Sequence, residues 1–161
     1  MFRSGAIVIA SLLGAPGVAG LAGPAAPGGC ALDRSRCAIL PPGDPTTWRE
    51  DLRTSEYPLT TADLEQAECL LIERAEVVNA GLEQEGAGEH IEVGEYYRQY
   101  CVLRDQEGHR ILFLNAFCSR PSTDAWRSAW VQVEDGGACY FQALFDLTSG
   151  TVLEFIVNGE A

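Results

Sequence analysis

The chain has 161 residues, of which 47% are hydrophobic, and its 11 basic and 23 acidic side chains give a formal net charge of −12. Every basic residue is an arginine. A surface this acidic repels phosphate backbones and anionic lipid headgroups, which argues against nucleic-acid binding and against attachment to anionic membranes. The length suits one domain preceded by a leader.

Residues 1–20 have the pattern of a bacterial secretory signal peptide. Arg3 supplies an early positive charge, the uncharged apolar run Ala6–Leu13 follows, and small residues stand near a cleavage point around Ala19. The apolar run is too short to span a bilayer as a helix, and Pro16 interrupts it. We therefore expect export to the periplasm or the extracellular space, with no transmembrane span in the mature chain.

The chain contains an even number of cysteines, which in an exported protein predicts disulfides: Cys30, Cys37, Cys69, Cys101, Cys118 and Cys139. No Cys-x-x-Cys spacing occurs, so neither a zinc ribbon nor a thioredoxin-type motif is supported. The acidic residues also lack the regular spacing of a calcium loop. We expect no metal and no cofactor.

Residues 21–58 are rich in proline and glycine and are expected to form an irregular leader. The prolines at positions 41, 42 and 45 exclude a continuous helix or central strand there. The leader either packs onto the domain as a strap or acts as a flexible tether. Cys30 and Cys37 are close enough to close a local loop. Alternatively, Cys30 is the lipid-modified residue of a lipoprotein, but Pro27 stands where the usual motif has leucine, so soluble export is favoured.

A domain is expected over residues 59–161, and it begins with a helix. Thr60 or Thr61 can cap it, with Asp63 and Glu65 near its positive end. Apolar residues then recur at steps of three and four, as on one face of a helix: Leu64, Ala67, Leu71, Ala75, Val78 and Leu82. The glutamates are expected on the other faces, and the helix is expected to end near Gly81.

The remainder alternates like strands separated by turns. Residues 96–104 and 110–118 predict one hairpin, and residues 138–146 and 151–158 predict a second. Residues 126–133 are expected to hold a short helical turn and a further strand. One helix followed by four or five antiparallel strands predicts an α+β domain, with the helix laid across a curled sheet in the manner of cystatins.

Strand ends and alternation give a hypothesis for two disulfides. Cys118 ends one predicted strand and Cys139 opens a neighbouring one, so these two are expected to pair. Cys69 on the helix and Cys101 in mid-strand would join the helix to the sheet if Cys69 faces inward.

Five polar residues are candidates for a binding site: Arg98, Tyr100, Asn115, Asp135 and Asn158. An arginine flanked by tyrosines on an open sheet face can hold a carboxylate or a sugar. Equally, Arg98 can form a salt bridge with one of the many acids while the tyrosines pack in the sheet. Asp135 and Asn158 precede glycines and are also explained by turn chemistry.

No catalytic motif is recognisable. The sequence lacks a Gly-x-Ser-x-Gly elbow and a His-Glu-x-x-His helix, and the two histidines, His90 and His109, are expected on the surface.

Several short features together resemble a group of uncharacterised exported bacterial proteins over residues 60–161. They are Tyr97–Tyr100, the strand containing Asn115, Asp135-Gly136-Gly137 followed by Cys139, and the ending Val157–Ala161. The resemblance implies export but no particular activity, cofactor or ligand.

We therefore expect a non-enzymatic module that binds a protein, a peptide or an envelope component outside the cytoplasm. One alternative is a small hydrolase with its site in the concavity of the sheet, which would need a deep pocket with convergent polar groups. Another is a protease inhibitor, which rests on fold analogy alone.

Overall fold

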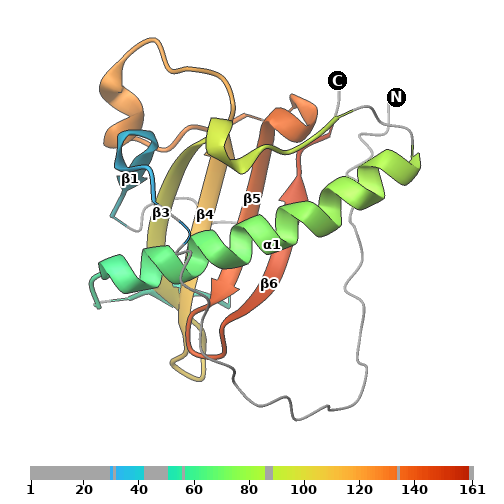
Figure 1. The fold of residues 1–161 in the computed structure, drawn as a ribbon. Coiled ribbons are helices and arrows are strands. Elements are labelled where there is room, and N and C mark those ends of the chain that lie inside the picture. Colours follow the sequence, from blue (N-terminus) through green and yellow to red (C-terminus); the bar gives the residue numbers. More distant parts are fainter. Residues whose placement is uncertain are drawn as a thin grey trace, which may run out of the picture.

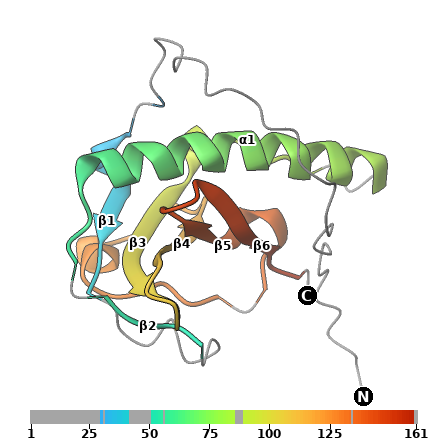
Figure 2. The same cartoon turned by 90° about the horizontal axis from the view of Figure 1, so that it is seen from below.

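A computed structural model describes Cys30 and residues 32–41, 51–55, 57–85, 89–133 and 135–159 (Figure 1). The predicted signal peptide lies outside these residues. Within them, one long helix crosses one face of a sheet, so the predicted α+β class is confirmed (Figure 2). No helix in the described part of the chain is long and apolar enough to cross a bilayer.

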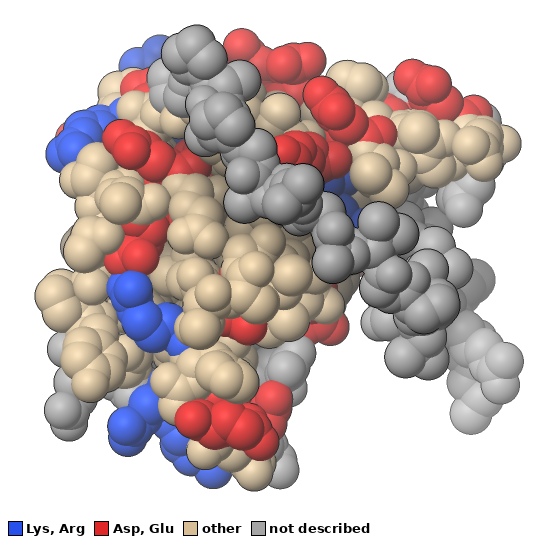
Figure 3. Space-filling view, turned by 60° about the horizontal axis from the view of Figure 1, so that its bottom comes forward, with Lys and Arg blue, Asp and Glu red and all other residues tan. Residues whose placement is uncertain are grey.

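The helix α1 spans Thr61–Glu85 and starts at a reciprocal cap. The Asp63 carboxylate accepts hydrogen bonds from the backbone N–H and the hydroxyl of Thr60, both at 2.8 Å, and the Thr60 hydroxyl accepts the Asp63 N–H. Arg110 donates to the same carboxylate and so ties the helix start to the sheet. Gly81 does not end the helix, because its backbone is not left-handed. Carboxylates lie along the side where α1 runs (Figure 3).

Four long strands form two antiparallel hairpins, as predicted: β3 (Tyr97–Arg104), β4 (Arg110–Phe117), β5 (Tyr140–Asp146) and β6 (Thr151–Val157). They lie side by side in chain order. Gly108 and Gly150 occupy the two tight turns with positive φ, which glycine adopts at no steric cost.

Part of the expected leader belongs to the sheet. The short strand β1 (Cys37–Ile39) pairs with β3 in parallel, and β2 (Arg53–Thr54) pairs with the other end of β3 in antiparallel fashion. The sheet is therefore mixed rather than wholly antiparallel. Strands of two and three residues carry too little alternation to be recognised in a proline-rich stretch.

Two disulfides are present, Cys30–Cys69 and Cys118–Cys139. The second confirms its prediction, whereas both the Cys69–Cys101 pair and the local Cys30–Cys37 loop are wrong. Cys101 cannot reach α1 because strand alternation turns it to the opposite face of the sheet, where it packs with Leu103 and Phe113. Cys37 and Cys101 are free thiols. The Cys30 sulfur, being bonded to Cys69, cannot simultaneously carry a lipid.

Apolar side chains fill the space between α1 and the sheet. The predicted helix stripe packs against the inward residues of the four strands, among them Tyr100, Leu112, Leu114, Phe141, Phe145 and Phe155. The concavity in which a hydrolase site was expected is thus occupied by core beneath α1.

The opposite face of the sheet is covered by the segment between β4 and β5. This segment contains a short 3-10 helix, Asp124–Arg127, but the strand expected before residue 133 does not form. Hydrogen bonds from side chains, rather than a ladder of backbone hydrogen bonds, hold this segment against the sheet. The buried Gln99 amide donates to the carbonyls of Trp126 and Ala129, at 2.6 and 2.8 Å, and accepts from the Asn115 amide and the Val131 N–H, at 2.9 and 3.0 Å. All four hydrogen-bonding positions of this amide are thereby used.

Gln99→Leu is expected to destabilise the fold by about 3 kcal/mol or more. The substitution leaves several buried polar groups without a hydrogen-bond partner, and each such group costs about 1–3 kcal/mol of stability. Urea denaturation measures the loss. The control is Gln142→Leu, on the same face, which removes only one 3.4 Å bond to Asn115 and should cost about 1 kcal/mol or less. Equal losses in the two variants would contradict this role of Gln99.

Candidate functional site

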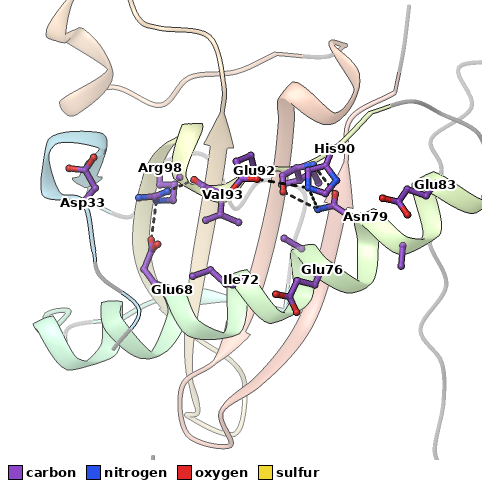
Figure 4. A pocket seen from close by; sticks show the side chains of 14 residues that line it. Asp33, Glu68, Ile72, Glu76, Asn79, Glu83, His90, Glu92, Val93 and Arg98 are labelled. Carbon is purple, nitrogen blue, oxygen red and sulfur yellow. Dashed lines mark hydrogen bonds and ion pairs between the residues drawn. The ribbon is translucent and has the colours of Figure 1, made fainter. Parts of the chain in front are cut away.

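A groove of about 500 Å³ runs between α1 and the segment that leads into β3 (Figure 4). Its helix side is formed by residues spaced three and four apart, which share one stripe of a helix: Glu68, Ile72, Ala75, Glu76, Asn79, Ala80 and Glu83. Its other side comes from Asp33, residues 90–94 and Arg98.

Asn79 and Arg98 fix the width of the groove. The buried Asn79 amide donates to the Ile91 carbonyl at 3.0 Å and accepts the Ile91 N–H at 2.7 Å. Arg98 donates to the Val93 carbonyl at 2.6 Å. An irregular segment is therefore held against the helix by side chains that satisfy its backbone groups.

The floor of the groove is apolar, and its rim is acidic. Ala75, Ile91 and Val93 are buried beneath it, and Ile72 is 38% exposed. Five carboxylates and one guanidinium line the groove, for a net charge of −4 without His90. Hydrogen bonds from the Ser35 side chain and backbone lower the pKa of Asp33, so this rim carboxylate is ionised at neutral pH. The lining therefore favours a positively charged occupant.

At one end of the groove lies a buried polar cluster. Arg98 and Glu68 are each only 2% exposed, and Arg98 Nε lies 3.0 Å from Glu68 Oε1. The Tyr100 hydroxyl donates to the same oxygen. Glu68 was expected on a solvent-facing side of the helix, and the structure corrects this. A glutamate close to the apolar stripe is the only signal in the sequence that could have suggested it.

Burial raises the pKa of Glu68 above its usual 4.5, against the attraction of Arg98 and the Tyr100 hydrogen bond. The folded state therefore favours the protonated carboxyl more than the unfolded state does. This contribution to stability is present at low pH and is lost as the pH rises through the folded pKa. Burial also raises the pKa of the free Cys37 thiol, which accepts an Arg98 N–H at 3.7 Å. A protonated thiol is a poor nucleophile.

The five predicted site residues do not converge. Arg98 and Tyr100 face α1. Arg98 forms a salt bridge with Glu68 there, which was the alternative to an open ligand site in the interpretation of the sequence. Asn115 lies on the opposite face, bonded to Gln99 and to the Val131 carbonyl. Asp135 pairs with Gly159 in an isolated bridge, and Asn158 donates to the Val133 carbonyl. Of the five, only Arg98 lines the groove.

Another polar cluster lies in the exposed β3–β4 turn. Asp105, Glu107 and His109 each place one potential metal-ligand atom within 4.8 Å of the others. The Asp105 carboxylate already accepts the His109 N–H and the imidazole Nδ1, both at 2.8 Å. These contacts account for the cluster as turn structure.

Comparisons with protein-family models, with curated proteins and with solved structures find no match for the chain.

Arg98→Met is expected to cost about 3–5 kcal/mol at neutral pH, because Glu68 is left as a buried charge without a partner. The loss should be smaller at acidic pH, where this carboxyl is protonated. The double variant Arg98→Met/Glu68→Leu should recover about 2 kcal/mol relative to the single variant. Denaturant titrations at both pH values measure these differences. A double variant no more stable than Arg98→Met would contradict the coupling.

The Asp105–His109 contact predicts a pH-dependent turn. Asp105 raises the pKa of His109 above 6.5, and the pKa of Asp105 itself is lowered below 3.8. The stabilisation from His109 is present below 6.5 and lost as the pH rises through its folded pKa, whereas that from Asp105 is lost as the pH falls through its own. NMR titration should place the His109 midpoint above 6.5, and Asp105→Asn should lower it. A midpoint unchanged by Asp105→Asn would refute the contact.

Proposed function

We propose that this protein is a binding module that acts outside the cytoplasm and holds a basic, extended segment of a partner protein in the groove beside α1. The observation that carries the proposal is the combination of an apolar floor with a lining of net charge −4. Lysine and arginine side chains suit such a surface, because their aliphatic stems pack on apolar groups while their charged ends reach the carboxylates.

The length of the groove favours a peptide over a compact small molecule. From Glu68 to Glu83 the helix rises 1.5 Å per residue, which makes the lining stripe about 22 Å long. An extended chain advances about 3.3 Å per residue, so six or seven residues would fill it. Side chains of an extended peptide alternate, so one set could lie on Ile72 while the other reaches Glu76 and Glu83.

The proposed location rests on covalent chemistry. Disulfides persist in the periplasm and the extracellular space and are rare in the cytosol. Cys30–Cys69 joins the N-terminal segment to α1, and Cys118–Cys139 joins the two halves of the sheet. Both agree with the export expected from the N-terminal pattern and from the resemblance to exported bacterial proteins.

A labelled peptide of alternating lysine and valine, seven residues long, is expected to bind saturably in fluorescence anisotropy, whereas its glutamate–valine counterpart should not. Ala80→Trp places a bulky ring on the groove lining and should weaken binding at least about tenfold. Glu76→Gln/Glu83→Gln should weaken it about two- to thirtyfold, since exposed ion pairs are worth about 0.2–1 kcal/mol each.

The matched control is Val77→Trp, on the same helix but outside the groove lining and 60% exposed. It should bind the basic peptide like the unmodified protein, with helix content checked by circular dichroism. If Ala80→Trp and Val77→Trp bind alike, the groove is not the binding site and the proposal fails.

A further inference from the structure

A second pocket, of about 490 Å³, has the opposite charge. It lies between the short 3-10 helix Arg34–Arg36, the start of β3 and residues 120–127. Three arginines line it, Arg36, Arg120 and Arg127, against the single carboxylate of Asp124. A lining of net charge +2 stands out in a chain whose net charge is −12. At physiological ionic strength charges act over about 8 Å, so the charges near the pocket, rather than the net charge of the chain, decide what binds there.

Two of the arginines are held in place by backbone carbonyls. Arg36 donates to the Glu95 carbonyl at 2.6 Å, and Arg127 donates to the carbonyls of Cys37, at 3.0 Å, and Ser35. Backbone carbonyls orient a guanidinium but carry no net charge.

The carboxylates near these two arginines are loose partners. Glu95 and Asp33 lie 3.6 and 3.9 Å from Arg36, and Asp124 lies 3.9 Å from Arg127. The side chain of Asp124 is 94% exposed. These distances are longer than a hydrogen bond of about 3 Å, so the carboxylates compensate only part of the arginine charge.

Aromatic rings also hold the guanidinium groups of Arg36 and Arg127 in position. Arg127 stacks over Trp126 at 4.3 Å, and Arg36 lies over Tyr97 at 5.2 Å. Trp126 is buried and packs edge-on against both Tyr97 and Phe117, so the ring beneath Arg127 is itself fixed by the core. The two guanidinium groups are therefore pre-positioned, which lowers the entropy lost on binding.

The third arginine, Arg120, differs from the other two. Within the part of the chain that the structure describes, it forms no hydrogen bond or ion pair, although it lines the same pocket. It lies two residues after Cys118, whose disulfide to Cys139 anchors this end of the segment. The hydroxyls of Ser122 and Thr123 lie on the lining beside it.

We propose that this pocket binds a dianionic tetrahedral oxyanion, a phosphate or sulfate group, either free or carried on a sugar. The free fork of Arg120 can donate two parallel hydrogen bonds to such a group. Arg36 and Arg127, which already donate to backbone carbonyls, add positive charge and their remaining N–H groups. Three guanidinium groups against one lining carboxylate favour a dianion over a monoanion. This site is separate from the acidic groove and does not depend on the function proposed for it.

The test is an NMR titration of the full mature protein at constant ionic strength, with inorganic phosphate, sulfate, glucose 6-phosphate and acetate as probes. Phosphate and sulfate should give saturable shifts at the amides of Arg120, Ser122 and Thr123, and acetate should bind at least about tenfold more weakly. Tighter binding of glucose 6-phosphate than of phosphate would identify a sugar-borne group, and equal binding would identify the free anion.

Arg120→Gln should weaken phosphate binding at least about threefold without affecting the fold, because Arg120 forms no hydrogen bond or ion pair with the described residues. Arg104→Gln is the control, since Arg104 is likewise an exposed arginine but lies at the far end of β3. Equal effects of the two variants, acetate binding as tight as phosphate, or no saturation would each overturn the proposal. Ala80→Trp should leave phosphate binding unchanged, which separates this site from the groove.

Discussion

The charged contact between Arg98 and Glu68 is the constraint on which most of this structure depends. Through it β3 is joined to α1, and the same guanidinium reaches the Val93 carbonyl and the Cys37 thiol of β1. A buried arginine must have its charge compensated, so these segments have to assemble together around it. The strand, the helix, the entry segment and part of the leader consequently meet at one point, and the groove begins there (Figure 4).

Charge is separated between two concave surfaces. The groove beside α1 collects carboxylates because an amphipathic helix exposes its polar stripe next to the segment that Asn79 holds in place. The pocket near β1 is lined by arginines, of which Arg36 donates to the Glu95 carbonyl and Arg127 to the Cys37 carbonyl of β1. At both surfaces side chains hydrogen-bond to backbone groups, yet the lining of one surface is negative and that of the other is positive.

The long elements could be predicted because their patterns are local. The helix start follows from Thr60 and Asp63, and the four long strands follow from alternation around Gly108 and Gly150. Cys118 and Cys139 could be paired because each stands at the end of such an element. By contrast, β1, the Cys30–Cys69 bond and the burial of Glu68 depend on contacts between residues about 30 to 60 positions apart. No local pattern encodes those contacts. The likeness to cystatins stays a prediction.

The sequence by itself determined the acidic charge, the helix-and-hairpin order and the inward stripe of α1, since these follow from composition and from periods of 3.6 and 2. Only the tertiary structure decided which polar residues are structural and which line a cavity. It buried Arg98 and Tyr100 between α1 and the sheet, bonded Asn115 to Gln99 on the opposite face of the sheet, and placed Arg120 at an open pocket. The physical reason is that a side chain's role depends on whether the fold gives it a partner, and those partners come from distant parts of the chain.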